Sequence, residues 1–150
     1  MLKPGDKIPE FILKQTDGTS VKSSEWEGQR IVLYFYPKDD TPGCTKEACS
    51  IRDSYTKLGQ QGIIVYGISP DNVESHQKFS AKYKLPFPLL SDPDHKVAER
   101  FGVWVEKNMY GKKSMGIART TFVIGEDGKV AEVIAKVNTE AHAEQLLEVL

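Results

Sequence analysis

Ile31-Val32-Leu33-Tyr34-Phe35-Tyr36 is the longest purely apolar run in the chain, and Pro37-Lys38-Asp39-Asp40-Thr41-Pro42-Gly43-Cys44 follows it directly. The run is apolar on both faces and rich in β-forming side chains, which is typical of a strand in the middle of a sheet. Pro37 ends that strand. Thr41-Pro42 favours a helix start, because threonine can cap and proline at the first helical position loses no hydrogen bond. The segment therefore predicts a buried strand, a short loop and a helix that carries Cys44 in its first turn.

Outward from this segment, strand and helix patterns alternate. The helix after Cys44 is expected to run on until Gly59. Its core-facing stripe consists of apolar residues at spacings of three and four: Ala48, Ile51, Tyr55, Leu58. The other expected elements are an N-terminal hairpin (Phe11–Leu13 with Ser20–Lys22), a buried strand (Ile63–Ile68), a helix (about Asn72–Tyr83), a short strand (Pro88–Leu90), a helix from Asp92 to Gly102, a hairpin (Thr120–Ile124 with Val130–Ile134) and a last helix from Thr139 to Leu150. This order predicts an α/β sandwich with a central mixed β-sheet flanked by helices, formed by one domain over residues 1–150.

Composition narrows the possible functions. The 150 residues include 20 basic and 21 acidic side chains, so we expect no nucleic-acid partner. No apolar run is long enough to span a bilayer, and the N-terminus lacks the apolar core of a signal peptide, so we expect no membrane partner. Two cysteines without a secretion signal are typical of a reducing compartment, where thiols are more often catalytic or metal-binding than structural. The sequence therefore predicts a cytoplasmic protein.

Cys44 occupies a position that favours a thiolate. With Thr41 as N-cap, Thr41-x-x-Cys44 has the form of a capping box, with sulfur in place of the usual carboxylate. The unpaired amides of a helix start and the helix dipole stabilise a negative charge there by about 0.3–1 kcal/mol when exposed and up to ~2 kcal/mol when partly buried. The helix dipole alone is too weak to make the thiolate the dominant form of Cys44 at neutral pH, so a nearby cation is also needed. Arg119 is the most suggestive of the four arginines because it directly precedes a predicted strand, although spacing alone does not place it beside Cys44.

Cys49 lies five residues further along the same predicted helix. Helix geometry separates the Cα atoms of two such residues by roughly 8.7 Å, whereas a disulfide usually requires about 4.4–6.8 Å. Either the two thiols never pair, or the helix unwinds locally when they do. A simpler interpretation of Cys49 is a small side chain buried under the helix.

Pro37-x-x-x-Thr41-x-x-Cys44 resembles the active-site signature of the peroxiredoxins, and Thr41-Pro42-Gly43-Cys44-Thr45-Lys46-Glu47-Ala48-Cys49 resembles the bacterioferritin comigratory protein (PrxQ-type) subfamily. The likeness covers nearly the whole chain and includes Tyr34-Phe35-Tyr36-Pro37, Ser69-Pro70-Asp71, Leu85–Asp92, Gly102-Val103-Trp104 and Arg119-Thr120-Thr121-Phe122-Val123. The resemblance implies a thioredoxin-like fold, a thiol peroxidase acting on hydrogen peroxide and organic hydroperoxides, and a role in antioxidant defence.

The same resemblance implies the roles of individual residues. Cys44 would be the peroxidatic cysteine, oxidised to a sulfenic acid, and Cys49 the resolving cysteine that forms a disulfide with it. Thr41 and Arg119 match residues that orient and activate the peroxide, and Pro37 matches one that shields the pocket. The family usually takes electrons from thioredoxin or a related dithiol, the subfamily is often monomeric, and we expect no metal and no other cofactor.

Other interpretations remain open from the residues alone. A thioredoxin-like disulfide exchanger normally uses Cys-x2-Cys, which this chain lacks. A metal-binding module could combine the cysteines with His76, His95 and His142, but the histidines are dispersed and are expected to be solvated or locally hydrogen-bonded. A non-catalytic redox sensor or holdase would use the same cysteine pair. Residues 106–116 are expected to form a solvated loop.

Overall fold

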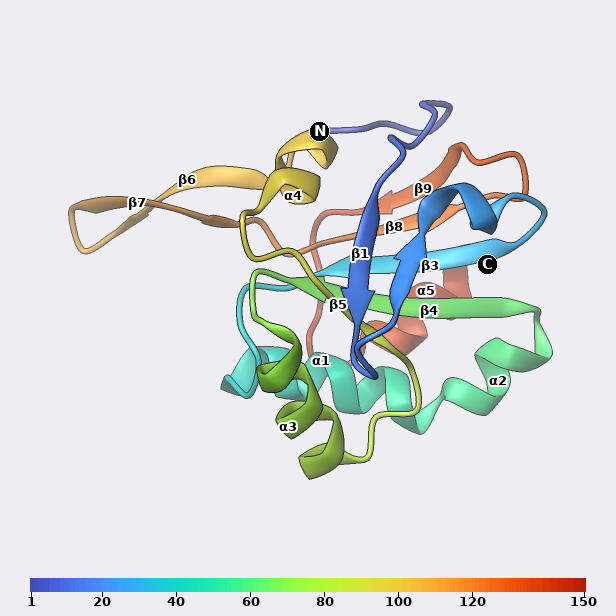
Figure 1. Cartoon of the computed structure of the whole chain (residues 1–150), viewed down its shortest axis with the longest axis horizontal. Helices are drawn as coiled ribbons and strands as arrows, with labels where there is room; N and C mark the ends of the chain where they lie inside the picture. Colours follow the sequence, from blue (N-terminus) through green and yellow to red (C-terminus); the bar gives the residue numbers. More distant parts are fainter.

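A seven-stranded mixed sheet forms the centre of the computed structural model, which describes residues 1–150 (Figure 1). The strand order is β2-β1-β5-β4-β3-β8-β9. Strands β3, β4 and β5 are parallel, whereas the remaining pairs in this sheet are antiparallel. The strands of this sheet are β1 (Ile12–Gln15), β2 (Ser20–Lys22), β3 (Arg30–Phe35), β4 (Ile63–Ser69), β5 (Leu89–Ser91), β8 (Thr120–Ile124) and β9 (Val130–Ile134). The predicted fold class and the N-terminal hairpin are confirmed.

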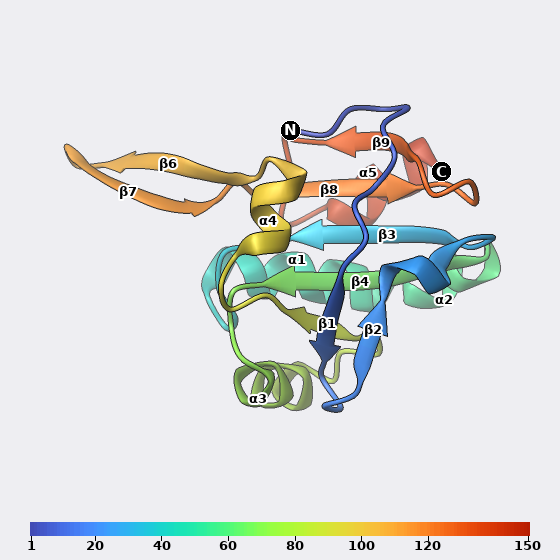
Figure 2. The same cartoon turned by 45° about the horizontal axis from the view of Figure 1, so that its top comes forward.

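Helices cover both faces of the sheet (Figure 2). They are α1 (Pro42–Asp53), α2 (Tyr55–Gln60), α3 (Val73–Tyr83), α4 (Lys96–Phe101), α5 (His142–Val149) and the 3-10 turn η1 (Ser23–Trp26). Alternate side chains of β3 enter two separate cores, as expected for a strand apolar on both faces. Ile31, Leu33 and Phe35 pack with residues of η1 and α4, while Val32 and Tyr34 pack with residues of α1, α2, α3 and α5. No helix combines the length and the apolar character that a membrane-spanning segment requires.

The register between β3 and β8 places Arg119 beside the start of α1. These strands run antiparallel, and Phe35 near the end of β3 pairs with Thr120 at the start of β8. The residue immediately before β8 therefore lies at the same edge of the sheet as the loop that leads from β3 into α1. Sequence spacing could not show this proximity, because it arises from strand pairing.

The helix expected to reach Gly59 is broken into two. Ser54 leaves the helical conformation with φ −112° and ψ 11°, and its amide donates to the carbonyl of Ile51 three residues earlier. Serine competes for backbone hydrogen bonds and so favours such ends. Gly59 lies inside α2, so the prediction of a single helix ending there was wrong. The last helix was also misplaced at its start, because α5 begins at His142 and Thr139 does not cap it.

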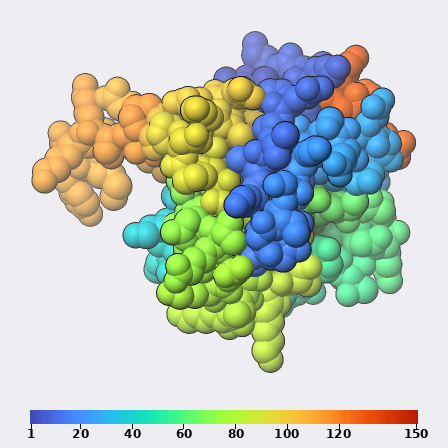
Figure 3. Space-filling view, viewed as in Figure 1, coloured from blue at the N-terminus to red at the C-terminus, as the bar shows by residue number.

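Residues 104–117 form a projecting two-stranded hairpin instead of the expected loop. Strand β6 (Trp104–Met109) pairs with β7 (Lys112–Ile117), and the hairpin extends away from the body of the molecule (Figure 3). Tyr110 and Gly111 form its two-residue turn with φ of 54° and 78°. A positive φ at both positions is typical of the turn that matches the twist of paired strands.

Candidate active site around Cys44

Helix α1 begins where the sequence predicted, and it holds Cys44 as its third residue. Thr41 is the N-cap with extended backbone, Pro42 is the first helical residue, and the amide of Thr45 donates to the Thr41 carbonyl at 2.8 Å. The Thr41 side chain does not complete a capping box. Its hydroxyl donates back to the Lys38 carbonyl at 2.9 Å, which ties the loop together and leaves the oxygen lone pairs free. Thr41 is therefore the N-cap that the sequence predicted, but its side chain makes no capping hydrogen bond.

Arg119 supplies the cation that the helix start alone lacked. Its Nη2 lies 3.2 Å from Cys44 Sγ, and its Nη1 donates to Glu47 Oε1 at 2.7 Å. The planar guanidinium is suited to such two-sided contact. Burial opposes the charge, but Glu47 and Cys44 together raise the pKa of Arg119 above its ordinary value. Cys44 is 1% exposed, so sulfur and guanidinium meet at a largely desolvated site where their attraction is strong.

Glu47 is a site residue that sequence reasoning missed. It lies three positions after Cys44, so both side chains share one face of α1, and its side chain is 0% exposed. Burial raises the pKa of Glu47 to about 7, although Arg119 acts in the opposite direction. Its Oε2 is a buried atom without a hydrogen-bond partner. The only sequence signal for Glu47 was its spacing of three residues from Cys44. This spacing does not distinguish a buried site residue from a charged residue that faces solvent.

His142 on α5 lies on the far side of Glu47. Its Nε2 is 2.8 Å from Thr121 Oγ1 and 3.5 Å from Glu47 Oε2. The ring is 0% exposed, and burial lowers the pKa of His142. His142 was expected to be solvated or locally hydrogen-bonded. It makes a local contact, with Nδ1 2.9 Å from Gln145 Oε1, but it is not solvated, because α5 packs its first turn against α1, as the bond from the Ala143 amide to Ser50 Oγ also shows.

The two cysteines lie in one continuous helix and are both free thiols. Cys44 is buried, whereas Cys49 is partly exposed, so Cys49 is not simply a core residue. Pro37 is half-buried between β3 and the loop.

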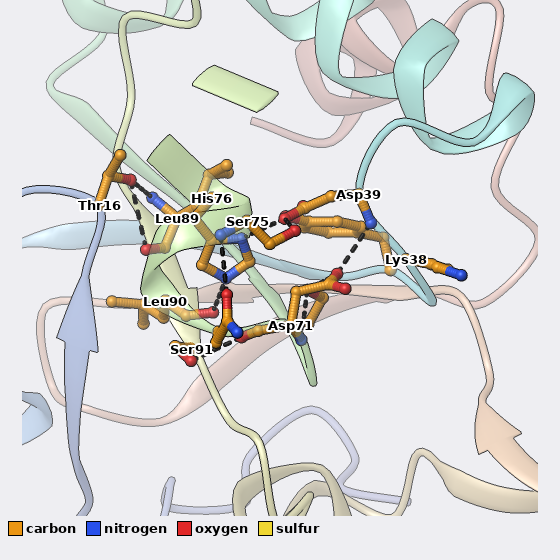
Figure 4. Close-up of polar contacts among 12 residues, drawn as sticks. Thr16, Lys38, Asp39, Asp71, Ser75, His76, Leu89, Leu90 and Ser91 are labelled. Carbon is orange, nitrogen blue, oxygen red and sulfur yellow. Dashed lines mark hydrogen bonds and ion pairs between the residues drawn. The ribbon is translucent and has the colours of Figure 1, made fainter. Parts of the chain in front are cut away.

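A second polar cluster anchors the loop before Cys44 (Figure 4). Asp39 is 7% exposed, and its Oδ1 accepts from Tyr36 at 2.6 Å while its Oδ2 accepts from the Ser75 hydroxyl at 2.8 Å. Its amide donates to Asp71 Oδ2 at 2.8 Å, and the hydroxyl of Ser69 donates to the same oxygen at 2.6 Å. The loop is thereby fixed to the end of β4 and to α3.

His76 completes this cluster. It is 0% exposed, and its Nδ1 and Nε2 lie 2.7 Å from Asp39 Oδ2 and 2.8 Å from the Leu90 carbonyl oxygen. The expectation of a solvated or locally hydrogen-bonded histidine was therefore wrong for His76. His95 and His142 both make a local contact, with His95 Nδ1 3.2 Å from Glu99 Oε1 and His142 Nδ1 2.9 Å from Gln145 Oε1. The three histidines have separate partners, so they do not form the metal module that combined them with the cysteines.

Comparison with known proteins agrees with this geometry. The AhpC/TSA family model matches residues 4–133. Peroxiredoxin Bcp of Bacillus subtilis is 47% identical over 146 residues, which cover 97% of this chain and 93% of the relative. Peroxiredoxin Bcp of Escherichia coli K12 is 46% identical over 146 residues, with 97% and 94% covered.

Solved structures of peroxiredoxins also resemble this chain closely. A mutant PrxQ from Xylella fastidiosa superposes with a TM-score of 0.93 at 36% identity, covering 99% of this chain and 94% of the other. The bacterioferritin comigratory protein of Xanthomonas campestris gives a TM-score of 0.88 at 37% identity, covering 95% and 96%. This chain belongs to the AhpC/TSA family and, within it, to the Bcp/PrxQ peroxiredoxins, which are thiol peroxidases.

Proposed function

We propose that Cys44 is the thiol that attacks the peroxide in this peroxiredoxin. One observation carries the proposal: Arg119 Nη2 lies 3.2 Å from Cys44 Sγ in the first turn of α1, where main-chain amides also favour an anion. The thiolate attacks the terminal oxygen of a hydroperoxide, the S–O bond forms as the O–O bond breaks, and Cys44 becomes a sulfenic acid. The departing alkoxide or hydroxide takes up a proton and leaves as alcohol or water.

Arg119 and Thr41 orient and activate the bound peroxide in this proposal. Because the Thr41 hydroxyl gives its hydrogen to Lys38, its oxygen is an acceptor for the O–H of the incoming hydroperoxide. Arg119 donates to the oxygens on which negative charge develops, so it contributes more in the transition state than in the ground state. Pro37 borders the loop and limits the access of water.

Cys49 resolves the oxidised enzyme. Its thiol condenses with the Cys44 sulfenic acid, a disulfide forms and water leaves, which protects Cys44 from irreversible oxidation. Thioredoxin or a related dithiol then reduces the disulfide and is itself oxidised. We further propose that residues 1–150 work as a single domain and a monomer in the cytoplasm, and that organic hydroperoxides are substrates. The bacterioferritin comigratory protein of Xanthomonas campestris is described as having alkyl peroxide reduction activity, which supports that substrate class.

Mass spectrometry of reduced protein after one equivalent of peroxide tests the assignment. The unsubstituted protein should form the Cys44–Cys49 disulfide, and Cys49→Ser should instead gain one oxygen on Cys44. Cys44→Ser should consume no peroxide. Arg119→Ala should slow the first oxidation by about 100-fold or more, since it removes a charged donor from the reacting atoms. Peroxide consumption by Cys44→Ser would overturn the proposal.

A further inference from the structure

Helix α5 has no N-terminal cap of its own. Its N-cap residue, Ala141, has no side-chain acceptor for the unpaired amides of the first turn. The amide of Ala143, the second residue of α5, donates instead to Ser50 Oγ of α1 at 3.1 Å. A serine side chain that accepts from this position of a helix contributes about 1 kcal/mol to its stability. Helix α1 therefore supplies the cap that the sequence around α5 lacks.

The part of α1 that contacts the start of α5 is the part that carries the two cysteines. Ser50 directly follows Cys49 in the chain. Lys46 lies between the two cysteines, and its Nζ is 3.2 Å from Glu140 Oε1, just before α5. Buried apolar side chains of both helices belong to one hydrophobic core: Ala48, Ile51, Ala143, Leu146. The position of α5 thus depends on the same segment of α1 whose cysteines are proposed to pair.

Pairing of Cys44 with Cys49 disrupts the helical turn to which Ser50 belongs. The two cysteines are five positions apart in one helix, so their Cα atoms are roughly 8.7 Å apart and their side chains point roughly 140° apart around the axis. A disulfide usually requires Cα atoms within about 4.4–6.8 Å of each other. The segment must therefore shorten and untwist, which breaks its backbone hydrogen bonds. In the helix the amide of Ser50 bonds to the carbonyl of Lys46, inside this segment, so Ser50 loses its place when the segment unwinds.

We propose that Ser50 couples α5 to the redox state of the cysteine pair: the Ser50–Ala143 contact caps α5 in the reduced form and is broken in the disulfide form. This inference rests on the proposed pairing of Cys44 with Cys49. In that step the Cys49 thiol displaces the hydroxyl of the Cys44 sulfenic acid, an S–S bond forms as the S–O bond breaks, and water leaves. Disulfide formation thereby loosens α5, and reduction of the disulfide docks it again.

The release of α5 is partial, because a second contact holds its first residue to the sheet. His142 Nε2 lies 2.8 Å from Thr121 Oγ1 on β8, and this contact involves no residue of α1. Leu146 is also buried in the core that α5 shares with the sheet. Oxidation should therefore increase the opening of α5 without detaching the C-terminal segment as a whole.

The same contact has a reciprocal effect on the cysteine pair. An interaction that exists in the reduced form and is missing from the disulfide form stabilises the reduced form by its own free energy. Ser50 is in this respect a positioning residue, because it acts through the helix rather than on the reacting sulfur atoms. Its bond to Ala143 favours the intact helix in which Cys44 meets the peroxide. Removing the hydroxyl should make the disulfide easier to form.

Amide exchange of α5 tests the inference on unsubstituted and Ser50→Ala protein, in the reduced form and after one equivalent of hydrogen peroxide. In the reduced form, Ser50→Ala should speed exchange of the α5 amides about fivefold, which corresponds to the loss of one cap. In the disulfide form, the unsubstituted protein should already exchange at this faster rate, and the substitution should add nothing. An equal effect of Ser50→Ala in both forms would overturn the inference, as would equal α5 exchange in both forms of the unsubstituted protein.

Ser80→Ala is the matched control. It removes a hydroxyl from α3, where the Ser80 side chain contacts the Leu85 carbonyl at 3.4 Å. The control should leave α5 exchange unchanged in both redox forms. Faster α5 exchange in this variant would show that α5 responds to any loss of a helix hydroxyl, and the specific role of Ser50 would be wrong.

The thiol–disulfide equilibrium with dithiothreitol supplies a second measurement, which a cap present in both redox forms would not change. Ser50→Ala should shift this equilibrium about fivefold toward the disulfide, which makes the reduction potential of the cysteine pair about 20 mV more negative. Ser80→Ala should leave the potential unchanged. An unchanged potential in Ser50→Ala would overturn the coupling.

The two proposals fail in different ways. If mass spectrometry finds no Cys44–Cys49 disulfide after peroxide treatment, the proposed pairing of the two cysteines is wrong. If the disulfide forms while α5 exchange and the reduction potential ignore Ser50→Ala, only the role of Ser50 is wrong.

Discussion

His76 and Asp39 join helix α3 to the loop that precedes the reactive cysteine, with Nδ1 2.7 Å from Oδ2 and both side chains buried. The second ring nitrogen of His76 lies 2.8 Å from the Leu90 carbonyl, so one imidazole links α3, the loop and β5. Because this loop ends at Thr41, the pair fixes the residues from which α1 starts.

His76→Asn should therefore lower the free energy of unfolding by about 3 kcal/mol, because it leaves buried polar groups on Asp39 and Leu90 without their partner. Urea unfolding of the reduced protein measures the change. His95→Asn is the matched control, since His95 pairs with the exposed Glu99 and such surface pairs contribute about 0–1 kcal/mol. Equal losses in the two variants would contradict the anchoring role of His76.

Because its carboxyl is buried, Glu47 should make the protein less stable as the pH rises from about 4.5 to about 7. Burial raises its pKa from 4.5 to about 7 in the folded protein. In that window the folded state keeps a proton that the unfolded chain has released, so the free energy of unfolding falls as pH rises. The stabilisation is fully present below the pKa that Glu47 has in the unfolded chain. It is lost as the pH rises through the pKa of the folded protein, and the total loss is about 3 kcal/mol.

Urea unfolding across this pH range, compared with Glu47→Gln, isolates the effect. The variant has no carboxyl at this position, so the difference between the two proteins should change with pH. The pKa of His142 is lowered by burial and acts with the opposite sign, but His142 is present in both proteins. Parallel stability curves would show that Glu47 does not titrate in this window.

Local sequence patterns were sufficient for most of the fold. The apolar run of β3 and the helix start at Thr41-Pro42 can each be recognised from a few neighbouring residues, and the structure contains both. The β6–β7 hairpin was missed because its strands carry few buried side chains, so the apolar alternation that marks a strand is weak. The Tyr110-Gly111 pair was the available turn signal.

Only those site residues whose type by itself indicates their chemistry could be predicted from the sequence. Cysteine at a helix start and an arginine before a strand could be selected in advance. Glu47 and His142 could not, because an acidic residue and a histidine on helices usually face solvent. Their burial depends on the packing of α5 against α1, which brings together residues far apart in the chain.

Disulfide formation should unwind part of α1. Cys44 and Cys49 lie in one helix, where five residues separate Cα atoms by roughly 8.7 Å, beyond the usual disulfide range. Hydrogen exchange should therefore show lost protection of amides from Thr45 to Asp53 in the oxidised protein, with β3 still protected. Reduced Cys49→Ser protein provides the helical reference. Equal protection of this segment in a confirmed disulfide form would refute the unwinding.

Gly43→Ala should slow peroxide reduction without destabilising the protein. A Cβ at this position would lie 3.2 Å from Arg119 Nη2, the nitrogen that contacts Cys44, so the guanidinium must shift. Alanine is the better helix former by up to about 1 kcal/mol, so thermal stability should hold or rise. Gly59→Ala in α2 is the control, because its Cβ meets nothing within 4 Å and only the stability gain should appear. Stopped-flow oxidation and thermal unfolding of both variants separate the two effects, and an unchanged oxidation rate in Gly43→Ala would mean that the Arg119 contact with Cys44 does not limit the reaction.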